Sequence, residues 1–307
     1  MVRRRDLTWQ RSELEELRSA VATARLSREP GSHHIVVVGP KGGSGKTTTA
    51  AMLATTLATS RGDIACVLDA THQLGTLRRR LVPSSEPPTR PFQELCARAG
   101  AGDLTAEWSA LAPYVDVVGS LRVLRSLSSS GPDLSPEEFE AGVSLLRRAA
   151  QIVVSDIGTK ANGPLAAAAF DCADTLVIAT ELAYDAVELT IELVSALAGE
   201  LLSYRPDPDN WSNVCDGRYA RLIANAVVVV SPSRQGGDNR EIGDQNLSAM
   251  LEWLRVVCGG GVVLIGRDDH LSIGDLIEQS KVDVESVVAY LRVASSVAAQ
   301  FAKADAS

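Results

Sequence analysis

Residues 39–50 read GPKGGSGKTTTA and directly follow the β-branched run IVVVG at 35–39. Gly42, Gly43 and Gly45 allow backbone N–H groups to approach phosphate oxygens that a Cβ atom would obstruct. A helix candidate at 45–60 comes next, and the N-terminal end of a helix attracts anions. The segment therefore predicts a strand, a loop and a helix that together bind the phosphates of a nucleotide.

The polar side chains of the loop are candidate ligands for that nucleotide and its metal ion. Lys46 would reach the β- and γ-phosphates, and Thr47 would supply a hydroxyl to Mg²⁺. Ser44 and Thr48 complete the polar side chains expected at the phosphates.

Short β-branched runs alternate with helix candidates along the rest of the chain. The strand candidates are IVVVG (35–39), IACVLDA (64–70), VDVVGS (115–120), QIVVSDI (151–157), DTLVIAT (174–180), AVVVV (226–230) and GVVLIG (261–266). The longer helix candidates are 45–60, 136–150, 184–202, 241–257 and 282–303. Such apolar strands are typical of parallel sheets, and their alternation with helices is typical of doubly wound folds. We therefore predict an α/β fold with a doubly wound, mostly parallel sheet and helices on both faces.

The chain is expected to have two parts. Residues 1–30 read as a charged, amphipathic helix that ends at REPG (28–31) and forms an appendage. Residues 31–307 would form the nucleotide-binding domain. Two stretches rich in Pro, Ser or Gly, 82–91 and 126–136, are expected to be surface loops beside the site.

Composition narrows the class of protein. The 307 residues are 45% hydrophobic, enough for one large core, and the net charge of -8 argues against a surface devoted to nucleic acid or membrane. No stretch resembles a signal peptide or a membrane span, so we expect a cytoplasmic protein without stable membrane insertion. The five cysteines lack the C-x-x-C spacing of zinc, iron–sulfur or redox sites.

Two aspartates end strand candidates at the carboxyl edge of the predicted sheet, where open α/β folds bind ligands. Asp156 is the candidate to hold Mg²⁺ through water, with a helix N-cap or a turn as the alternative. Asp69 is the candidate second carboxylate near the metal, with a structural hydrogen bond to the phosphate loop as the alternative. The candidate metal ligands are thus Thr47, Asp69 and Asp156.

The nucleotide base is expected between the ends of the last two strand candidates. The residues there are Ser231 and Pro232, and Gly266, Arg267 and Asp268. We predict that they line the base-binding part of the site.

Two other polar groups are interpreted as solvent-exposed. His33 and His34 precede the first strand candidate with no further ligand at metal spacing, so they are predicted to lie in a loop. The run Arg78, Arg79 and Arg80 is predicted to be a solvated face rather than a contact to nucleic acid or a partner.

The phosphate-binding loop departs from the usual pattern G-x-x-x-x-G-K-[ST], because Pro40 replaces the first glycine and Lys41 is an additional lysine. KGGSGKTT at 41–48 resembles the deviant Walker A motif of the ParA/MinD family of P-loop ATPases. The stretches 67–81 and 152–159 resemble that family's second motif and its Walker B strand, and 173–197 resembles the segment after it. The ending, 262–302, is similar to actinobacterial members, some of which accompany type VII secretion systems.

The resemblance implies an ATP-binding, ATP-hydrolysing and dimerising switch that positions DNA or a protein complex. In this family the first lysine, here Lys41, crosses a nucleotide-sandwich dimer to the phosphates bound by the other subunit. The candidate catalytic residues are then Lys41, Lys46, Asp69 and Asp156, and the cofactors are ATP and Mg²⁺. Expected partners are a second copy of the chain, non-specific DNA, and a protein such as a centromere-binding protein or a secretion component. An ATPase accessory to type VII secretion and a nucleotide-binding scaffold with little hydrolysis remain alternatives.

Thr71 departs from the second motif of the family, D-x-[DN]-P, which places Asp or Asn two residues after the position of Asp69. In the family that residue helps to organise the attacking water, and threonine offers only a neutral hydroxyl. We therefore predict tight Mg-ATP binding with slow turnover. The alternative is that Asp69 or Asp156 performs this role.

Overall fold

The computed structural model describes residues 15, 16, 18, 19, 21, 22, 32–71, 75–125, 134–158, 163–198, 219–233 and 245–301. Most of the amphipathic helix predicted at 1–30 and most of the loop predicted at 126–136 lie outside these residues. Within the described residues, no helix has the length and apolar character needed to cross a bilayer.

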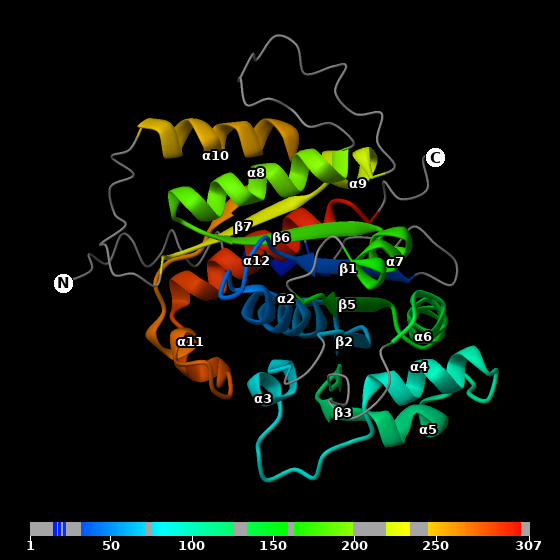
Figure 1. Ribbon diagram of the computed structural model, residues 1–307. Coiled ribbons are helices and arrows are strands. Elements are labelled where there is room, and N and C mark those ends of the chain that lie inside the picture. Colours follow the sequence, from blue (N-terminus) through cyan, green and yellow to red (C-terminus); the bar gives the residue numbers. More distant parts are fainter. Residues whose placement is uncertain are drawn as a thin grey trace.

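Strands and helices alternate along the described chain, as the sequence predicts (Figure 1). The strands are β1 (His33–Val38), β2 (Ala65–Asp69), β3 (Val115–Val118), β4 (Leu121–Leu124), β5 (Ile152–Asp156), β6 (Thr175–Glu181), β7 (Val227–Ser231) and β8 (Val262–Leu264). The helices are α2 (Lys46–Arg61), α3 (Leu77–Leu81), α4 (Phe92–Gly100), α5 (Trp108–Leu111), α6 (Pro136–Ala149), α7 (Pro164–Cys172), α8 (Tyr184–Ala198), α9 (Ala220–Ala224), α10 (Gln245–Val257), α11 (Asp269–Ile273) and α12 (Val284–Ala298), with short 3₁₀ turns at Ala112–Tyr114 and Gln279–Lys281.

The described strands form one eight-stranded sheet in the order β3-β4-β2-β5-β1-β6-β7-β8. All neighbouring pairs are parallel except β3 and β4. The first described strand, β1, is central: β2, β3 and β4 extend the sheet to one edge, β5 returns between β2 and β1, and β6, β7 and β8 extend it to the other edge. This confirms the predicted doubly wound, mostly parallel α/β fold.

The β3 edge of the sheet differs from the prediction. The run at 115–120 was expected in the parallel sheet, but β3 is antiparallel to β4, a strand absent from the prediction. The two strands are joined by the tight turn at Gly119 and Ser120. Val117 and Val118 are 63% and 38% exposed, because an edge strand has a neighbour on one side only.

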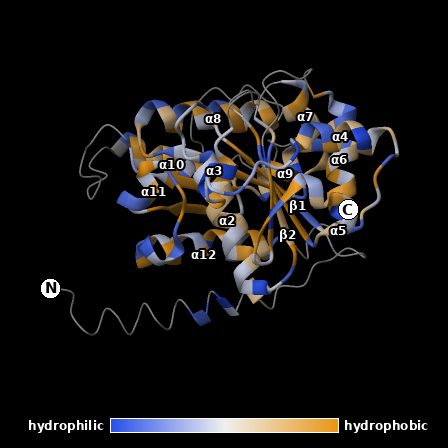
Figure 2. Ribbon diagram, turned by 90° about the horizontal axis from the view of Figure 1, so that it is seen from below, coloured by the Kyte–Doolittle hydropathy of each residue, from blue (hydrophilic) through white to orange (hydrophobic). Residues whose placement is uncertain are grey.

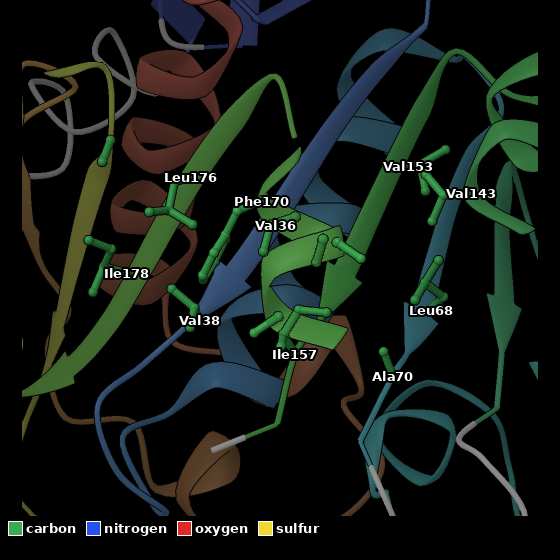
Figure 3. Packing of buried hydrophobic residues seen from close by; sticks show 14 of the residues in the cluster. Val36, Val38, Leu68, Ala70, Val143, Val153, Ile157, Phe170, Leu176 and Ile178 are labelled. Atoms are coloured by element: carbon green, nitrogen blue, oxygen red, sulfur yellow. The ribbon is translucent and has the colours of Figure 1, made fainter. Parts of the chain in front are cut away.

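Side chains of the central strands alternate between two buried faces. In β1, Val36 and Val38 belong to the core under α4, α6, α7, α8 and α10, whereas Ile35 and Val37 belong to the core under α2, α3, α11 and α12. Figure 3 shows the first face, with Phe170 of α7 beside Val36. Because both faces are covered, the central strands are hydrophobic along nearly their whole length (Figure 2).

Helix α6 shows how a local sequence signal sets a boundary. Ser135 Oγ accepts a hydrogen bond from the Glu138 N–H at 3.2 Å, and Glu138 Oε2 accepts one from the Ser135 N–H at 3.1 Å. Pro136 occupies the first helical position. This capping box fixes the start of the helix that packs on α4 and α7.

His33 and His34 are not in a solvated loop, so that prediction is wrong. They are the first residues of β1 and are almost fully buried between β5 and β6. His34 Nε2 lies 2.8 Å from Ser155 Oγ, and His34 Nδ1 lies 3.0 Å from the carbonyl oxygen of Cys172. Hydrogen bonds from neighbouring elements satisfy the buried imidazole, and burial lowers its pKa to about 4.

Part of the N-terminal segment packs on the domain. Val21 is fully buried in the core that contains α2, and its carbonyl oxygen accepts a hydrogen bond from Arg61 Nη1 at 2.9 Å. Arg61 is the last residue of α2. The contact lies at the C-terminal end of that helix, one helix length from the phosphate-binding loop.

Candidate functional site

The carboxyl ends of the parallel strands bring the predicted site residues to one edge of the sheet. The loop 39–45 joins β1 to α2, and Asp69 and Asp156 are the last residues of the neighbouring strands β2 and β5. Asp69 pairs with Asp156 in the strand register, and Glu181 pairs with Ser231. Residues more than a hundred positions apart in the sequence thus border the same loop.

Close packing explains two glycines of the loop. A Cβ at Gly39 would lie 2.4 Å from the carbonyl oxygen of Ala179, so no other residue fits between β1 and β6. Gly45 has φ +86°, and a Cβ there would lie 3.1 Å from Ser231 Oγ. The left-handed backbone at Gly45 turns the chain into α2, whose first residue is Lys46.

Lys46 reaches back over the loop. Its Nζ donates to the carbonyl oxygen of Lys41 at 2.8 Å and to Ser44 Oγ at 3.4 Å. The residue is 7% exposed. Burial lowers the pKa of Lys46, and the nearby Asp156 carboxylate acts in the opposite direction. The ammonium group therefore lies inside the loop that would surround the phosphates.

Asp156 is fully buried beside the start of α2. Thr47 Oγ1 donates to its Oδ2 at 2.6 Å. Its Oδ1 is buried and has no hydrogen-bond partner in the part of the chain that the structure describes. Burial and the neighbouring Asp69 carboxylate raise the pKa of Asp156 to about 7, against the effects of Thr47 and Lys46. A buried carboxylate oxygen left without a donor, next to a hydroxyl, fits a site for Mg²⁺ and its water ligands.

Asp69 makes a different set of contacts. Its Oδ1 accepts hydrogen bonds from the backbone N–H of Thr71 at 3.0 Å and from Thr71 Oγ1. Its Oδ2 accepts one from the N–H of Leu77, the first residue of α3, at 3.2 Å. Burial raises the pKa of Asp69, and these donors act against that shift. Asp69 thus lies beside Asp156 while it anchors the segment that follows β2.

Lys41 is held by acidic groups of its own chain. Its Nζ lies 2.7 Å from Oδ2 of Asp185, at the start of α8, and 3.7 Å from Oε2 of Glu181, the last residue of β6. The hydrogen bond that Lys41 donates to Asp185 raises the pKa of Lys41, and it lowers the pKa of Asp185. The two lysines of the loop therefore have separate surroundings, one buried in the loop and one at the surface.

A cavity of about 480 Å³ opens next to the loop. Residues of the phosphate loop and of the predicted base site line it together. The lining includes Gly43, Gly45, Thr48, Glu181, Ser231, Pro232, Gly266, Arg267, Asp268, Leu271, Gly274 and Tyr290. Gly42 lies in the same loop and is exposed. The structure thus brings Gly43, Gly45 and Thr48 and the residues that we assigned to the base around one cavity.

The two charged residues at the base end of the cavity differ in their contacts. The side chain of Arg267 is 74% exposed and its Nε lies 3.1 Å from Asp269 Oδ1. Asp268 is buried, and its two carboxylate oxygens accept hydrogen bonds from the N–H groups of Leu271 and Asp283, each at 2.9 Å. Asp268 therefore caps α11 and shapes the cavity wall.

Arg80 corrects the interpretation of the arginine run as a solvated face. Arg79 is exposed, but Arg80 is only 2% exposed and contacts Thr48. Leu77 and Leu81 are buried on the same side of α3, at helical spacing from Arg80. That spacing was the one signal in the sequence for a buried arginine.

Comparison with known proteins shows the family to which the chain belongs. The family of CobQ/CobB/MinD/ParA nucleotide binding domains matches residues 35–303. The matched residues contain the phosphate loop, both aspartates and the whole cavity lining.

The individual proteins that the chain resembles have low sequence identity to it. The chain is 25% identical over 283 residues to the ESX-1 secretion-associated protein EspI of two Mycobacterium tuberculosis strains; this covers 92% of the chain and 39% of EspI. Among solved structures it resembles a ParA family ATPase from Chlorobium tepidum (TM-score 0.59, 15% identity, 89% of this chain and 95% of that one). It also resembles the septum site-determining protein MinD of Pyrococcus horikoshii in complex with Mg-ADP (TM-score 0.57, 15% identity, 86% of this chain and 94% of that one). The structural matches support the fold.

Proposed function

Because the chain belongs to the family of CobQ/CobB/MinD/ParA nucleotide binding domains, we propose that it is a Mg-ATP-dependent dimerising switch. The observation that carries the proposal is the cavity that joins the phosphate loop to residues 231–233 and 265–268. Its phosphate end is lined by Gly43, Gly45 and Thr48, next to the buried Lys46 in the chain, and its base end is lined by residues that follow β7 and β8. A purine nucleotide with its phosphates at the start of α2 fits both ends.

Each side chain at the phosphate end has a distinct task in this proposal. Lys46 exchanges its contact with the carbonyl oxygen of Lys41 for phosphate oxygens, because a phosphate is the stronger acceptor. Thr47 and Asp156 would hold Mg²⁺, and Asp69, which pairs with Asp156 in the strand register, would bind water ligands of the ion. When bound, Mg²⁺ neutralises charge on the phosphates and on the buried carboxylates.

Hydrolysis is proposed to be slow because of Thr71. Its hydroxyl donates to Asp69 Oδ1. Its methyl group faces Gly158, where an added Cβ would lie 3.4 Å from it. A neutral hydroxyl is a weaker acceptor for the protons of an attacking water than a carboxylate is. The protein would therefore remain in the ATP-bound form for long periods.

Dimerisation is proposed to follow from Lys41. In the single chain its ammonium group is paired with Asp185 and Glu181. The phosphates of a nucleotide bound by a second copy would offer a more concentrated negative charge than these partly exposed carboxylates. ATP would then favour a dimer in which each Lys41 leaves Asp185 for the partner's nucleotide.

The cargo of the switch is proposed to be DNA or a protein complex. A second candidate function, an accessory ATPase of a secretion apparatus, is favoured by the match to EspI over 92% of the chain. A scaffold that binds nucleotide with little hydrolysis is the third candidate, and it is favoured by Thr71.

Nucleotide binding tests the proposal first. Titration with fluorescent ATP in the presence of Mg²⁺ should show saturable binding to the wild-type protein, and Lys46→Ala should abolish it. Lys281→Ala, at an exposed lysine paired with Glu278, is the matched control and should bind normally. A wild-type protein that binds no ATP would refute the proposed function.

A gel shift then separates the cargo classes. At low salt, ATP but not ADP should allow the protein to retard DNA of any sequence, because phosphate contacts dominate such binding and weaken as salt rises. Lack of DNA binding in the presence of ATP would favour the secretion or scaffold candidates.

A further inference from the structure

Arg80 is a buried guanidinium behind the wall of the nucleotide cavity. Its Nη2 donates to Thr48 Oγ1 at 3.0 Å and to the carbonyl oxygen of Leu271 at 2.9 Å. Its Nη1 donates to the carbonyl oxygen of Asp275 at 3.1 Å. Thr48 and Leu271 both line the cavity, on its phosphate side and its base side. One side chain therefore joins the two halves of the cavity wall.

The contact with Arg80 determines what the Thr48 hydroxyl can offer to a ligand. A threonine hydroxyl has one hydrogen to donate and two lone pairs to accept with. Because Thr48 Oγ1 accepts from Arg80, its own hydrogen is left to donate. Thr48 is the third residue of α2, next to the loop that holds Lys46, and a donor polarised by a buried cation is a strong one. The pair offers the cavity a hydroxyl donor supported by positive charge.

The helix of Arg80 is also tied to the metal edge of the site. The N–H of Leu77, at the start of α3, donates to Asp69 Oδ2 at 3.2 Å. At the other end, the carbonyl oxygen of Arg80 accepts a hydrogen bond from the N–H of Ile277 at 2.8 Å. Helix α3 is thus fixed both to the end of β2 and to the chain that follows α11.

We infer that Arg80 is a positioning residue for the bound nucleotide. It orients the Thr48 hydroxyl to donate to the phosphate nearest the start of α2, and it fixes the base-side wall through the carbonyl groups of Leu271 and Asp275. The inference rests on the proposed function, because it requires a nucleotide in this cavity.

The first test measures binding of fluorescent ATP and ADP to three variants. Arg80→Met removes the charge and all donors but keeps an unbranched side chain. It should weaken the binding of both nucleotides by about tenfold or more. Arg80→Lys keeps the charge without the planar fork, and should recover part of the loss. Arg79→Met, at the exposed neighbour in the same helix, is the control and should bind as the wild type does.

A double-mutant cycle separates positioning from a purely structural role. Thr48→Val removes the hydroxyl at nearly constant volume, and Thr48→Ser keeps it. We expect Thr48→Val to weaken binding and Thr48→Ser to bind nearly as the wild type does. The double variant of Arg80→Met and Thr48→Val should bind nucleotide about as well as the single variant with the lower affinity, because both substitutions remove the same interaction.

Circular dichroism and thermal melting without nucleotide show which variants fold. If Arg80→Met fails to fold, Arg80→Lys replaces it in the cycle with Thr48→Val. Normal binding by a folded Arg80→Met, normal binding by Thr48→Val, or losses that multiply in the cycle would each overturn the inference while wild-type binding stands. A wild-type protein that binds neither nucleotide would overturn the proposed function, and the inference with it.

Discussion

Lys41 and Lys46 belong to one short loop but differ in charge environment. Lys46 is buried, and its Nζ donates to two neutral oxygens of the loop at 2.8 and 3.4 Å, which phosphate oxygens could replace. Lys41 is partly exposed and is paired with two carboxylates of its own chain. At the scale of single residues, Lys41 would have to lose these partners before it could contact a second chain, as the proposed dimer requires.

Asp185→Asn tests this exchange. The substitution removes the carboxylate charge from the shorter ion pair of Lys41, so ATP-dependent dimers should form at a roughly two- to fivefold lower protein concentration, as suits an exposed pair. Analytical ultracentrifugation over a concentration series measures the shift. Glu188→Gln, at an exposed carboxylate of the same helix, should leave it unchanged. Weaker dimerisation of Asp185→Asn would show that the pair supports the dimer instead.

Thr71→Asp tests the account of slow turnover. A carboxylate at this position can accept a proton or hold a water, so steady-state ATP hydrolysis should rise by about 10–100-fold while Mg-ATP binding is retained. Thr71→Asn should give a smaller rise. Thr76→Asp, at an exposed residue before α3, controls for added charge and should turn over as the wild type does. Equal rates for wild type and Thr71→Asp at saturating ATP would remove the catalytic meaning of Thr71.

At the scale of helices and strands, the order of the elements could be predicted from the sequence. Which of their residues are buried could be predicted only in part. Apolar runs and helix signals located seven strands and the phosphate loop, because buried parallel strands and glycine-rich turns have local signatures. β4 was missed because the residues LRVL follow the run at 115–118 after only two residues. The apolar residues alone do not show that the chain turns back after β3 to form a second, antiparallel strand.

Burial of polar residues could not be predicted locally. His34 and Arg80 resemble surface residues in the sequence, and each becomes buried only because distant elements supply its hydrogen bonds. Ser155 and Cys172 are more than a hundred positions from His34, and Leu271 is nearly two hundred from Arg80. Candidate site residues could be proposed where they follow a motif, whereas Arg80, whose burial depends on tertiary contacts, could not.

Strands β1 and β5 carry groups with opposite effects on the pH dependence of stability. The pKa of His34 is about 4 in the folded chain, so between pH 6.5 and 4 only the unfolded chain gains a proton there, and the free energy of unfolding falls by up to about 3 kcal/mol as pH falls. The pKa of Asp156 is raised to about 7, so below pH 7 the folded chain takes up the extra proton and gains stability.

Urea unfolding between pH 4.5 and 7.5 should separate the two effects. His34→Gln removes the imidazole contribution, so its free energy of unfolding should rise relative to the wild type as pH falls. Asp156→Asn removes the opposite contribution, so its free energy of unfolding should fall relative to the wild type over the same range. Curves for both variants that remain parallel to the wild-type curve would contradict the assignment of these pKa values.

At the scale of the whole molecule, the sheet edge that gathers the phosphate loop, Asp69, Asp156 and the start of α8 forms one surface of the nucleotide site. Lys41 lies at the border of that surface with Asp185. A second copy placed against it would meet nucleotide and lysine together, which would make ATP binding and dimerisation a single coupled equilibrium. In the proposed switch, only the triphosphate would change the oligomeric state.

The most direct test is the molar mass in solution, measured by light scattering after size-exclusion chromatography without nucleotide, with ADP, and with ATP or a non-hydrolysable ATP analogue, all with Mg²⁺. We expect the 32.5 kDa single chain without nucleotide and with ADP, and twice that mass with ATP. Lys41→Ala should remain a single chain with ATP while it still binds fluorescent ATP. A wild-type protein that binds ATP and stays at 32.5 kDa, or one that is a dimer under every condition, would contradict the central claim.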